Sequence, residues 1–464
     1  MKITRRESLG LFAKGAVAAS ISPSVFCVGA EKGSLIPGKV IGANGMVNVA
    51  WVGVGNRGNR IISNFERSGI LNIVALCDVD LETKHMAEAK SRFPKAKLFQ
   101  DWRKMLDKMD NEIDAVVVLV PDHSHFPISM ASMAMGKHVY TEKPLARTFQ
   151  EIELMMAAEK RYKVVTQMGN QGHSGWNYFQ FKEWVNAGVI KDVTHVDAYM
   201  NKWRRWHPWG DVPGYPTGET KPESMDWDIW LGVTPLENEF SERFHPGNWR
   251  GWYQYGTGCF GDWGAHVLDT IHRFLELGLP EKITATTLIQ PNKWVYPLAS
   301  TINFQFPKRK GMPAMDIDWY DGQENLPPIP KEFAGQEFDI KQPGKFIYSK
   351  DLVFQGDSHG STLKIVPLDK MRDMLRDGKI GKDYGEHSDH YANFLLSCRG
   401  DEKPRSPYSV SGPLSQVLAL GCMAQRLGGE LKFDRKTKQF TNNKVANALL
   451  KDNVRKGWEQ YYKL

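Results

Sequence analysis

The sequence is poor in cysteine. Its 464 residues include only five cysteines, and these are scattered along the chain at Cys27, Cys77, Cys259, Cys398 and Cys422. No two of them have the close spacing of a zinc ribbon, and their wide separation is not that of a disulfide framework. The sequence therefore predicts neither a metal-ribbon module nor a small domain held together by disulfides.

Two further features are missing. No uninterrupted apolar stretch is long enough to span a bilayer, and no block of Lys and Arg accompanies the formal net charge of +7. We therefore predict neither an integral membrane protein nor a nucleic-acid-binding protein. Internal repeats and low-complexity segments are absent too. Because 464 residues exceed one ordinary hydrophobic core, we expect two domains.

The N-terminus has the layout of an export signal. Residues 4–10 read TRRESLG, so Arg5 and Arg6 precede an apolar, Ala-rich run that ends in small residues. The arginine pair resembles the twin-arginine signal of proteins exported in the folded state, although Ser8 stands where an aromatic residue is usual. We predict a signal peptide over 1–30 and a linker over 31–45. The expected location is periplasmic, or cytoplasmic if the leader is not used.

A glycine-rich turn follows the first strand-like run. Residues 48–55 read NVAWVGVG, and the spacing GxGxxG leads directly into a helical stretch. In a Rossmann unit the glycines permit a tight turn, let a pyrophosphate approach the backbone, and let the helix pack on the strand. The phosphate then lies at the N-terminus of the helix. The cofactor-binding residues predicted here are Gly53, Gly55, Asn56, Arg57 and Gly58.

A second strand-like run, NIVALCDVD, places Asp78 about 20 residues after the last glycine of the turn. A carboxylate in this position accepts hydrogen bonds from both ribose hydroxyls of a dinucleotide. It also repels a 2′-phosphate, so we predict NAD rather than NADP as the cofactor. The alternative is that Asp78 is only a solvated turn residue.

Two more strand-like runs are DAVVVLVP over 114–121 and HVYTEKP over 138–144. They alternate with helical segments. Strands that alternate with helices in this way are typical of a parallel α/β domain. We therefore predict an α/β fold, with a doubly wound Rossmann domain over 46–165. Pro121, His125, Glu142 and Lys143 follow strand ends, where a cofactor cleft forms.

From about Val47 onward the chain resembles the glucose-fructose oxidoreductase and inositol dehydrogenase (Gfo/Idh/MocA) family. The resemblance rests on the glycine turn, Asp78, the segment from Pro121 to His125, the sequence EKP at 142–144, and GDWGAHVLD at 261–269. It implies that Lys143 reaches both the nicotinamide ribose and the substrate, and that Asp262 and His266 flank the reacting hydroxyl. It also implies an α+β second domain over 166–464 with a mostly antiparallel open sheet, and return helices near 387–428.

The residue types suit that chemistry in their own right. Removal of a hydride from a secondary alcohol needs a base for the hydroxyl proton, and neutral histidine serves near neutral pH, so His266 is our base. Asp262 lies four residues earlier on the same helix face, and Lys143 can stabilise the developing charge on oxygen. A surface ion pair, or a metal site formed by Asp262, His266 and Asp269, is the alternative. We predict no metal and assign Asp269 a structural role.

The second domain supplies the expected substrate region. More than half of the 15 tryptophans lie between Trp203 and Trp263, among them Trp206, Trp209, Trp227, Trp230, Trp249 and Trp252, interleaved with Arg204, Arg205, His207 and Arg250. Aromatic rings beside hydrogen-bonding groups suit sugars, although each ring taken alone is more typical of a core or a subunit interface. Asn170 is a further candidate cofactor contact. The Pro-rich segment over 324–345 looks like an inserted loop, and a homo-oligomer through the sheet of this domain is expected.

Three functions remain open at this point. The first is an NAD-dependent oxidoreductase that moves a hydride between tightly held cofactor and a secondary hydroxyl of a sugar or glycoside. The second is a redox-neutral cycle through a transient keto sugar, whose net result is glycoside hydrolysis, elimination or epimerisation. The third is a sugar-binding protein without catalysis. Export favours a retained cofactor, because free nicotinamide nucleotide is not expected outside the cytoplasm.

Overall fold

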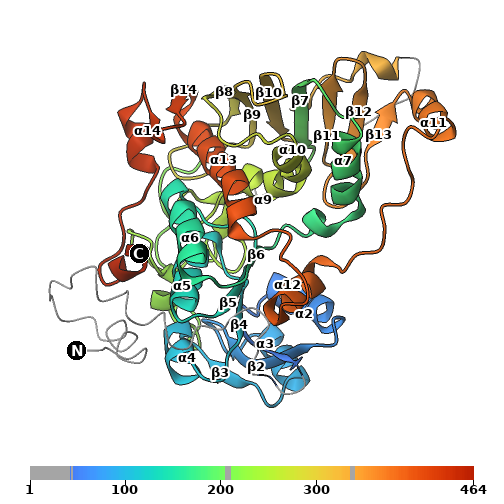
Figure 1. Ribbon diagram of the computed structural model, residues 1–464. Helices are drawn as coiled ribbons and strands as arrows, with labels where there is room; N and C mark the ends of the chain where they lie inside the picture. The colour runs from blue at the N-terminus through green and yellow to red at the C-terminus, as the bar shows by residue number, and fades with distance from the viewer. Residues whose placement is uncertain (1–41, 43–44, 204–210, 335–339) are drawn as a thin grey trace.

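The computed structural model describes residues 42, 45–203, 211–334 and 340–464. Figure 1 shows a lower unit in blue and blue-green, and an upper unit that holds a long sheet in green, yellow and orange. The signal peptide predicted over 1–30 and most of the linker predicted over 31–45 lie outside the described residues.

The lower unit is built on a six-stranded parallel sheet in the order β3-β2-β1-β4-β5-β6. Its strands are β1 (Val47–Val52), β2 (Leu71–Cys77), β3 (Lys97–Phe99), β4 (Ala115–Val118), β5 (His138–Thr141) and β6 (Thr166–Met168). The central strands are rich in Val and Ala and are buried, as parallel strands between two helix layers are. The strand order confirms the predicted doubly wound architecture. The sheet reaches Met168, a little beyond the boundary predicted at residue 165.

Two helix layers cover this sheet. The helices of its own sequence are α2 (Arg57–Glu66), α3 (Lys84–Arg92), α4 (Trp102–Lys108), α5 (Asp122–Ala134) and α6 (Phe149–Tyr162). α2 and α3 share one hydrophobic cluster with a helix from much later in the chain, α12 (His390–Arg399). α4, α5 and α6 share another cluster with the C-terminal segment, where Trp458 and Tyr461 pack against Trp102. The first domain is therefore completed by residues from the far end of the sequence.

The upper unit is built on a nine-stranded sheet in the order β13-β12-β11-β7-β10-β9-β8-β14-β15. Its strands are β7 (Val193–Met200), β8 (Lys282–Ile289), β9 (Ala299–Phe306), β10 (Met315–Asp321), β11 (Gly344–Ser349), β12 (Val353–Asp357), β13 (Lys364–Val366), β14 (Gly429–Asp434) and β15 (Gln439–Phe440). β7 and β10 run parallel, and the other neighbouring pairs are antiparallel. The predicted mostly antiparallel sheet is thus confirmed.

One face of the second sheet is covered by helices that form its hydrophobic core. They include α7 (Trp176–Asn186), α9 (Gly258–Val267), α10 (Asp269–Phe274) and the long α13 (Tyr408–Leu427). Shorter pieces are η3 (Gln171–Ser174), α8 (Trp227–Leu231), η4 (Asn248–Gly251), η5 (Lys331–Phe333), α11 (Leu368–Arg376), α14 (Lys444–Leu449) and η6 (Glu459–Tyr462). α13 packs on both α6 and α9, so it joins the two domains. Among the described helices, none has the length and apolarity needed to cross a membrane.

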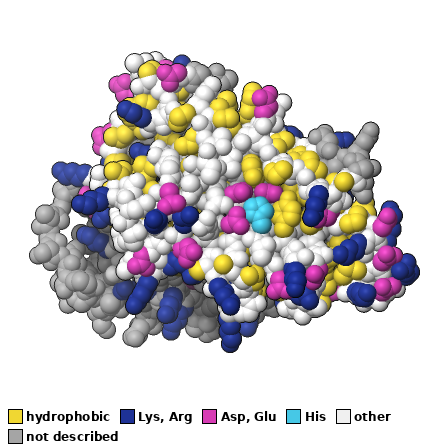
Figure 2. All heavy atoms as spheres, turned by 90° about the horizontal axis from the view of Figure 1, so that it is seen from above, with side chains coloured by type: hydrophobic (Ala, Val, Ile, Leu, Met, Phe, Trp, Pro, Cys, Tyr) yellow, Lys and Arg dark blue, Asp and Glu magenta, His cyan; other side chains and the backbone are white. Residues whose placement is uncertain are grey.

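The other face of the second sheet carries polar groups in its middle. His195 on β7 hydrogen-bonds through Nδ1 to Asp316 at 3.0 Å and through Nε2 to Asp197 at 3.1 Å, with Asp318 beside them. Figure 2 shows a histidine bordered by acidic side chains on this face, next to hydrophobic side chains. The two carboxylates raise the pKa of His195 to about 10 against the opposing effect of burial, so this histidine is an imidazolium held between them.

Candidate active site

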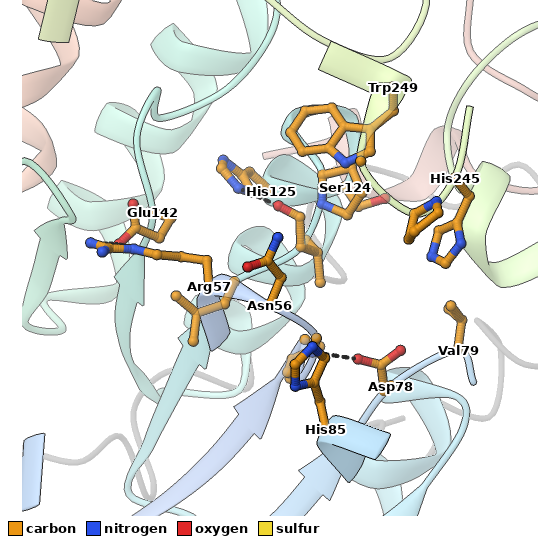
Figure 3. A pocket seen from close by; sticks show the side chains of 18 of the residues that line it. Asn56, Arg57, Asp78, Val79, His85, Ser124, His125, Glu142, His245 and Trp249 are labelled. Atoms are coloured by element: carbon orange, nitrogen blue, oxygen red, sulfur yellow. Dashed lines mark hydrogen bonds and ion pairs between the residues drawn. The ribbon is translucent and has the colours of Figure 1, made fainter. Parts of the chain in front are cut away.

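A cavity of about 670 Å³ lies at the carboxyl ends of the parallel strands, under the second domain. Its walls include the glycine turn after β1, the residues that follow β2, β4 and β5, helix α9, and the loop between β12 and β13. Figure 3 shows Arg57 and Glu142 at one end and Asp78 and His85 at the other. This is where open α/β sheets bind their ligands.

The glycine turn has the shape that a pyrophosphate requires. Gly53 has φ +89°, and a Cβ there would lie 2.4 Å from the carbonyl oxygen of Leu119. A Cβ on Gly58 would lie 2.0 Å from the carbonyl oxygen of Gly53, so this glycine lets α2 pack on β1. A Cβ on Gly55 would meet nothing within 4 Å, so the backbone there faces open space in the cavity. The residues present fit a dinucleotide at the N-terminus of α2.

Asp78 follows β2 and is joined to the same turn. Its carboxylate accepts hydrogen bonds from the backbone N–H of Val54 at 2.7 Å and of Gly55 at 3.3 Å. Burial raises the pKa of Asp78, while these N–H groups oppose that rise. Asp78 lines the cavity, as the predicted contact with ribose hydroxyls requires.

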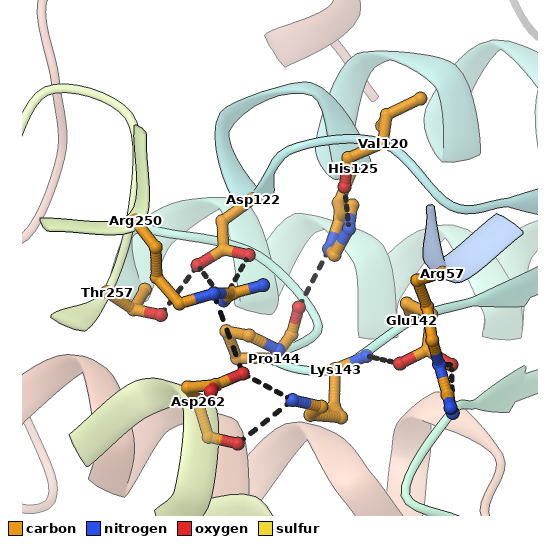
Figure 4. Close-up of polar contacts among 10 residues, drawn as sticks. All are labelled: Arg57, Val120, Asp122, His125, Glu142, Lys143, Pro144, Arg250, Thr257 and Asp262. Carbon is orange, nitrogen blue, oxygen red and sulfur yellow. Dashed lines mark hydrogen bonds and ion pairs between the residues drawn. The ribbon is translucent and has the colours of Figure 1, made fainter. Parts of the chain in front are cut away.

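Lys143 follows β5 and reaches across the cavity to the second domain. Its Nζ lies 2.6 Å from Oδ1 of Asp262 and 3.0 Å from the carbonyl oxygen of the same residue (Figure 4). Burial lowers the pKa of Lys143, although the charge of Asp262 opposes this. The preceding residue, Glu142, pairs with Arg57 at 3.1 Å.

Asp262 belongs to a chain of alternating charges. Arg250 Nε lies 3.5 Å from its Oδ1, and Arg250 donates from Nη1 to both oxygens of Asp122 at 2.9 and 3.1 Å (Figure 4). Thr257 donates to Asp122 at 2.6 Å. Two carboxylates and two cations, all largely buried, thus balance one another between the two domains.

His266 lies one helical turn after Asp262 on α9, and both side chains line the cavity. The imidazole is 5% exposed, and its Nδ1 has no hydrogen-bond partner in the part of the chain that the structure describes. Burial lowers the pKa of His266 well below 6.5, and the nearby Lys143 and His359 lower it further. His266 is therefore neutral at neutral pH and holds a lone pair that can accept a proton.

The family models agree with this geometry. Residues 47–170 match an oxidoreductase family model with an NAD-binding Rossmann fold, and residues 192–292 match the C-terminal alpha/beta domain of the same family. The chain belongs to the Gfo/Idh/MocA oxidoreductase family. Its first domain is accordingly an NAD-binding Rossmann domain, and the predicted cofactor is confirmed.

Curated relatives in this family carry hydrolase names. A glycosyl hydrolase family 109 protein of Solibacter usitatus is 31% identical over 255 residues, which cover 50% of this chain and 57% of that protein. An alpha-N-acetylgalactosaminidase of Shewanella oneidensis is 29% identical over 255 residues, covering 48% and 55% respectively. The chain thus spans little more than half the length of these relatives.

Solved structures share the fold. An NAD-binding protein of Listeria innocua aligns with a TM-score of 0.57 at 15% identity, over 83% of this chain and 99% of that one. The WlbA dehydrogenase of Bordetella pertussis, solved with NADH and UDP-GlcNAcA, aligns with a TM-score of 0.56 at 16% identity, over 84% and 99%. At this level of identity the likeness concerns the fold alone.

Most of the site residues predicted from the sequence line the cavity. They are Gly53, Gly55, Asn56, Arg57, Asp78, Pro121, His125, Glu142, Lys143, Asp262 and His266. Gly58 does not line the cavity but packs closely against the carbonyl group of Gly53 in the same turn. The ring of His125 lies between the carbonyl oxygens of Val120 at 2.9 Å and Pro144 at 2.8 Å, so it ties two strand ends together. Their roles in binding and catalysis stay predictions.

Asn170 is not among the residues that line the cavity. It is 1% exposed, donates to Asp269 at 3.0 Å and accepts from Ser406 at 2.7 Å. Its neighbour Gln171 lines the cavity in its place. Asp269 also bonds to His173 at 2.7 Å, which agrees with the structural role expected for it.

The tryptophan-rich region divides between cavity and core. Trp230, Trp249 and Trp263 line the cavity, whereas Trp252 is fully buried in the hydrophobic cluster that also holds Trp230. Trp227 stacks on Trp230 with centroids 4.2 Å apart. Arg204, Arg205, Trp206, His207 and Trp209 lie outside the described residues. His123 is buried, and its Nε2 lies 2.7 Å from the carbonyl oxygen of Trp230.

The segment 211–256 also covers the far end of the cofactor cavity. Asp226 N–H donates to the carbonyl of Val79 at 2.8 Å, and Met225 forms a bridge with Asp80. Gln100 donates to the carbonyl of Ser224 at 2.6 Å. In Figure 3, His245 and Trp249 of this segment border the cavity from the second domain. The second domain thus covers the cavity from Lys143 to the residues after Asp78.

Sequence reasoning missed two parts of the site. The first is the Arg250–Asp122 pair, whose members lie in segments that the sequence had singled out separately. The second is His359, which lines the cavity from the loop between β12 and β13 and whose ring stacks on that of His266. No motif marks His359, and neither family model extends to it.

Proposed function

We propose that this protein is an NAD-dependent enzyme that removes a hydride from a secondary hydroxyl-bearing carbon of a sugar or glycoside. The observation that carries this proposal is the convergence of Lys143, Asp262 and His266 on the cavity that the glycine turn and Asp78 also line. The three residues come from both domains, so the site is assembled only where the domains meet.

The proton chemistry follows from the charge states of these residues. Neutral His266 accepts the hydroxyl proton as the hydride leaves the same carbon. The ammonium group of Lys143, held by Asp262, stabilises the oxygen that becomes a carbonyl. NAD, when bound, supplies the acceptor of the hydride. Arg250, which also pairs with Asp122, faces the same Oδ1 of Asp262 that Lys143 contacts, so this second cation helps to hold the carboxylate that keeps Lys143 in place.

The lining of the cavity supports a carbohydrate substrate. Trp230, Trp249 and Trp263 offer flat apolar surfaces, and Gln171 and Ser124 offer hydrogen-bonding groups. Sugars need both, because their CH faces are apolar and their edges carry hydroxyls. The names of the relatives, which refer to glycosides and to a sugar nucleotide, point the same way.

The second candidate is a redox-neutral reaction on a glycoside, in which the hydride is taken and later returned. The hydrolase names of the curated relatives favour it, and so does the cover that segment 211–256 places over the cavity. A covered cofactor that regenerates itself needs no exchange with solvent. Lys143 fits the dehydrogenase pattern equally well, so we keep simple oxidation first.

One experiment separates these functions. The purified protein is analysed for bound nucleotide and then mixed with a panel of glycosides, while NADH absorbance and products are followed by mass spectrometry. Reduced cofactor with a stable keto sugar supports oxidation. Free sugar and aglycone with unchanged cofactor support the redox-neutral reaction. A protein that binds sugars but no nucleotide is a binding protein, and both enzymatic proposals then fail.

We further propose that the protein is exported in the folded state with NAD in place, and that it self-associates through the outer face of the nine-stranded sheet. Replacement of Arg5 and Arg6 by Lys should retain the protein in the cytoplasm, as cell fractionation would show.

Replacement of Tyr320 on the outer face of the nine-stranded sheet by Glu should reduce the mass measured by sedimentation if copies pair there. An unchanged location or mass would reject the respective proposal.

A further inference from the structure

His359 is a cavity residue that the chemistry above does not use. It stands in the loop between β12 and β13 and lines the cavity together with Lys143, Asp262 and His266. A plain hydride transfer from a hydroxyl needs one proton acceptor, which His266 provides. His359 is therefore an imidazole beside the proposed catalytic residues that this step does not require.

The backbone of His359 is held in place by contacts with the segment that follows β6. It has φ +58°, a conformation that is uncommon for residues with a side chain. Its carbonyl oxygen accepts from Asn177 Nδ2 at 3.3 Å, and the next carbonyl, of Gly360, accepts from Asn177 N–H at 3.2 Å. A Cβ on Gly172 would lie 2.7 Å from the carbonyl oxygen of His359. The close packing of these two segments fixes where the imidazole stands.

The ring of His359 lies flat against that of His266. Their centroids are 3.9 Å apart and their planes differ by 20°, while Trp263 meets His359 edge to face at 5.3 Å. Because N–H bonds and lone pairs lie in the plane of an imidazole, two stacked rings cannot hydrogen-bond to each other. His266 and His359 therefore do not form a relay. Both residues line the cavity, so each can act separately on a molecule that binds there.

The nitrogens of His359 are not equivalent. Nδ1 lies 2.8 Å from Oγ of Ser358, and this hydroxyl can act as donor or acceptor. Either tautomer of His359 is therefore satisfied, so Nε2 can carry a proton or a lone pair. Burial lowers the pKa of His359 to about 4, and the charges of Lys143 and Arg57 add to this, while Asp262 opposes it. His359 is thus neutral at neutral pH, as His266 is.

We propose that His359 is a second proton acceptor of the site, which removes the proton from the carbon next to the newly formed carbonyl. This inference rests on the proposed function. The carbon–hydrogen bond breaks, its electron pair forms the carbon–carbon double bond of an enolate, and the proton passes to Nε2. The negative charge moves to the carbonyl oxygen, which faces the ammonium of Lys143. The reverse step returns the proton.

Two neutral imidazoles in contact suit such a sequence. A proton on His266 repels a second proton on His359, so the two acceptors act one after the other. A redox-neutral reaction on a glycoside needs proton removal from this carbon, whereas simple oxidation does not. His359 therefore bears on which of the two candidate functions the protein has.

The test uses the full-length protein with bound nucleotide and, as probes, the ring-keto derivatives of methyl glucopyranoside. With NAD bound, no hydride is available, and proton exchange next to the carbonyl is followed in deuterium oxide by NMR and mass spectrometry. With NADH bound, reduction of the same ketones is followed by absorbance. We expect His359→Gln to slow exchange at least thirtyfold and to change reduction less than threefold.

The controls separate this inference from the proposed function. His387→Gln, which changes an exposed histidine away from the cavity, should leave both rates unchanged. If the natural protein reduces a ketone without exchanging its proton, or if His359→Gln exchanges normally, the inference is overturned and the proposed function stands. If His359→Gln loses both rates together, His359 only supports His266, and the inference is again overturned. If no ketone is reduced by the NADH form, the proposed function itself fails.

Discussion

Lys143 Nζ lies 2.6 Å from Oδ1 of Asp262, although the two residues belong to different domains and are 119 positions apart in the chain. Both side chains are largely buried, and Asp262 also faces Arg250, which in turn holds Asp122. Removing one member of such a set leaves an uncompensated charge away from water. Several consequences of this pair and its neighbours can be measured.

Lys143→Met should abolish hydride transfer and also destabilise the fold. Loss of one partner of a buried pair costs about 3–5 kcal/mol, because the remaining carboxylate stays buried. Lys143→Met combined with Asp262→Asn should recover part of that stability without recovering activity. Urea unfolding and a single-turnover assay measure the two quantities. Lys97→Met, which breaks an exposed pair with Glu112, serves as the control and should cost less than about 1 kcal/mol.

His266→Asn should reduce hydride transfer by roughly two to four orders of magnitude, the usual contribution of a positioned base. In the natural protein the pKa of His266 is well below 6.5, so the residue stays neutral at neutral pH and gains a proton only in acid. The single-turnover rate should therefore be level from about pH 8 to 6.5 and fall only below that range. A rate that declines from pH 8 downward, or near-normal turnover in the variant, would remove His266 as the base.

Asp78→Ser should weaken NAD binding and relax the discrimination against NADP. The variant loses a charged acceptor for the ribose hydroxyls, worth about 1.5–3 kcal/mol, while Arg60 and Lys84 remain in the cavity wall near the same site. Dissociation constants for both nucleotides can be measured by fluorescence. Asp369→Ser, on the exposed helix α11, is the matched control. Equal affinities in the variant and the natural protein would show that Asp78 does not contact the ribose.

Gly172→Ala should push His359 out of position. The new Cβ would lie within 3.0 Å of three backbone atoms of His359, and backbone cannot yield as the end of a flexible side chain does. We expect a loss of about 1–3 kcal/mol in the free energy of unfolding, typical of overpacking. Circular dichroism in urea measures this. Gly188→Ala is not a matched control because its φ is positive, so Gly214→Ala, in open space, is used instead.

Acid should destabilise the protein well before its carboxylates are protonated. Burial lowers the pKa of His123 to about 3 and that of His138, His272 and His390 to about 4. These pKa values lie below the pKa of about 6.5 that histidine has in the unfolded chain. Each histidine therefore makes its full contribution to the free energy of unfolding above about pH 6.5. It is lost as the pH falls, at roughly 1.4 kcal/mol per pH unit per histidine.

Other groups act in the opposite direction. Burial raises the pKa of Asp321 to about 6 and also raises that of Asp78, so these carboxyls add stability as the pH falls, but they are fewer than the buried histidines. The pKa of His195 is about 10, so its contribution grows as the pH falls to about 6.5 and is constant below that value. The urea midpoint should therefore drop between about pH 6.5 and 5. His272→Gln should make the dependence shallower, and His387→Gln, at the surface, should not. A midpoint that stays constant over this range would contradict the expected neutral state of the buried histidines.

The first domain was largely predictable because its signals are local. Strand, glycine turn and helix follow one another within 20 residues, and Asp78 and Lys143 stand at strand ends that parallel pairing brings to one edge. Asp262 and His266 were predicted from the resemblance to the Gfo/Idh/MocA family, and the structure places both in the cavity wall. At residues 170 and 171 the chain turns so that Gln171 lines the cavity while Asn170 donates to Asp269.

The sequence does not reveal contacts between distant segments, because such contacts leave no local sequence pattern. Asp122 and Arg250 stand 128 positions apart, and nothing near either residue specifies the other. His359 is placed by the close approach of its loop to Gly172, which depends on how β12 and η3 pack in three dimensions. The parallel pairing of β7 with β10 inside an otherwise antiparallel sheet likewise depends on tertiary packing.

Because Trp458 and Tyr461 pack on Trp102, and α12 covers α2, the nucleotide domain cannot finish folding until the last stretch of chain has left the ribosome. The domain that is synthesised first is therefore completed last. By then the segment 211–256, which closes over the cofactor cavity, has long been made. The contacts of Trp102 with Trp458 and Tyr461 are thus among the last that the growing chain can make.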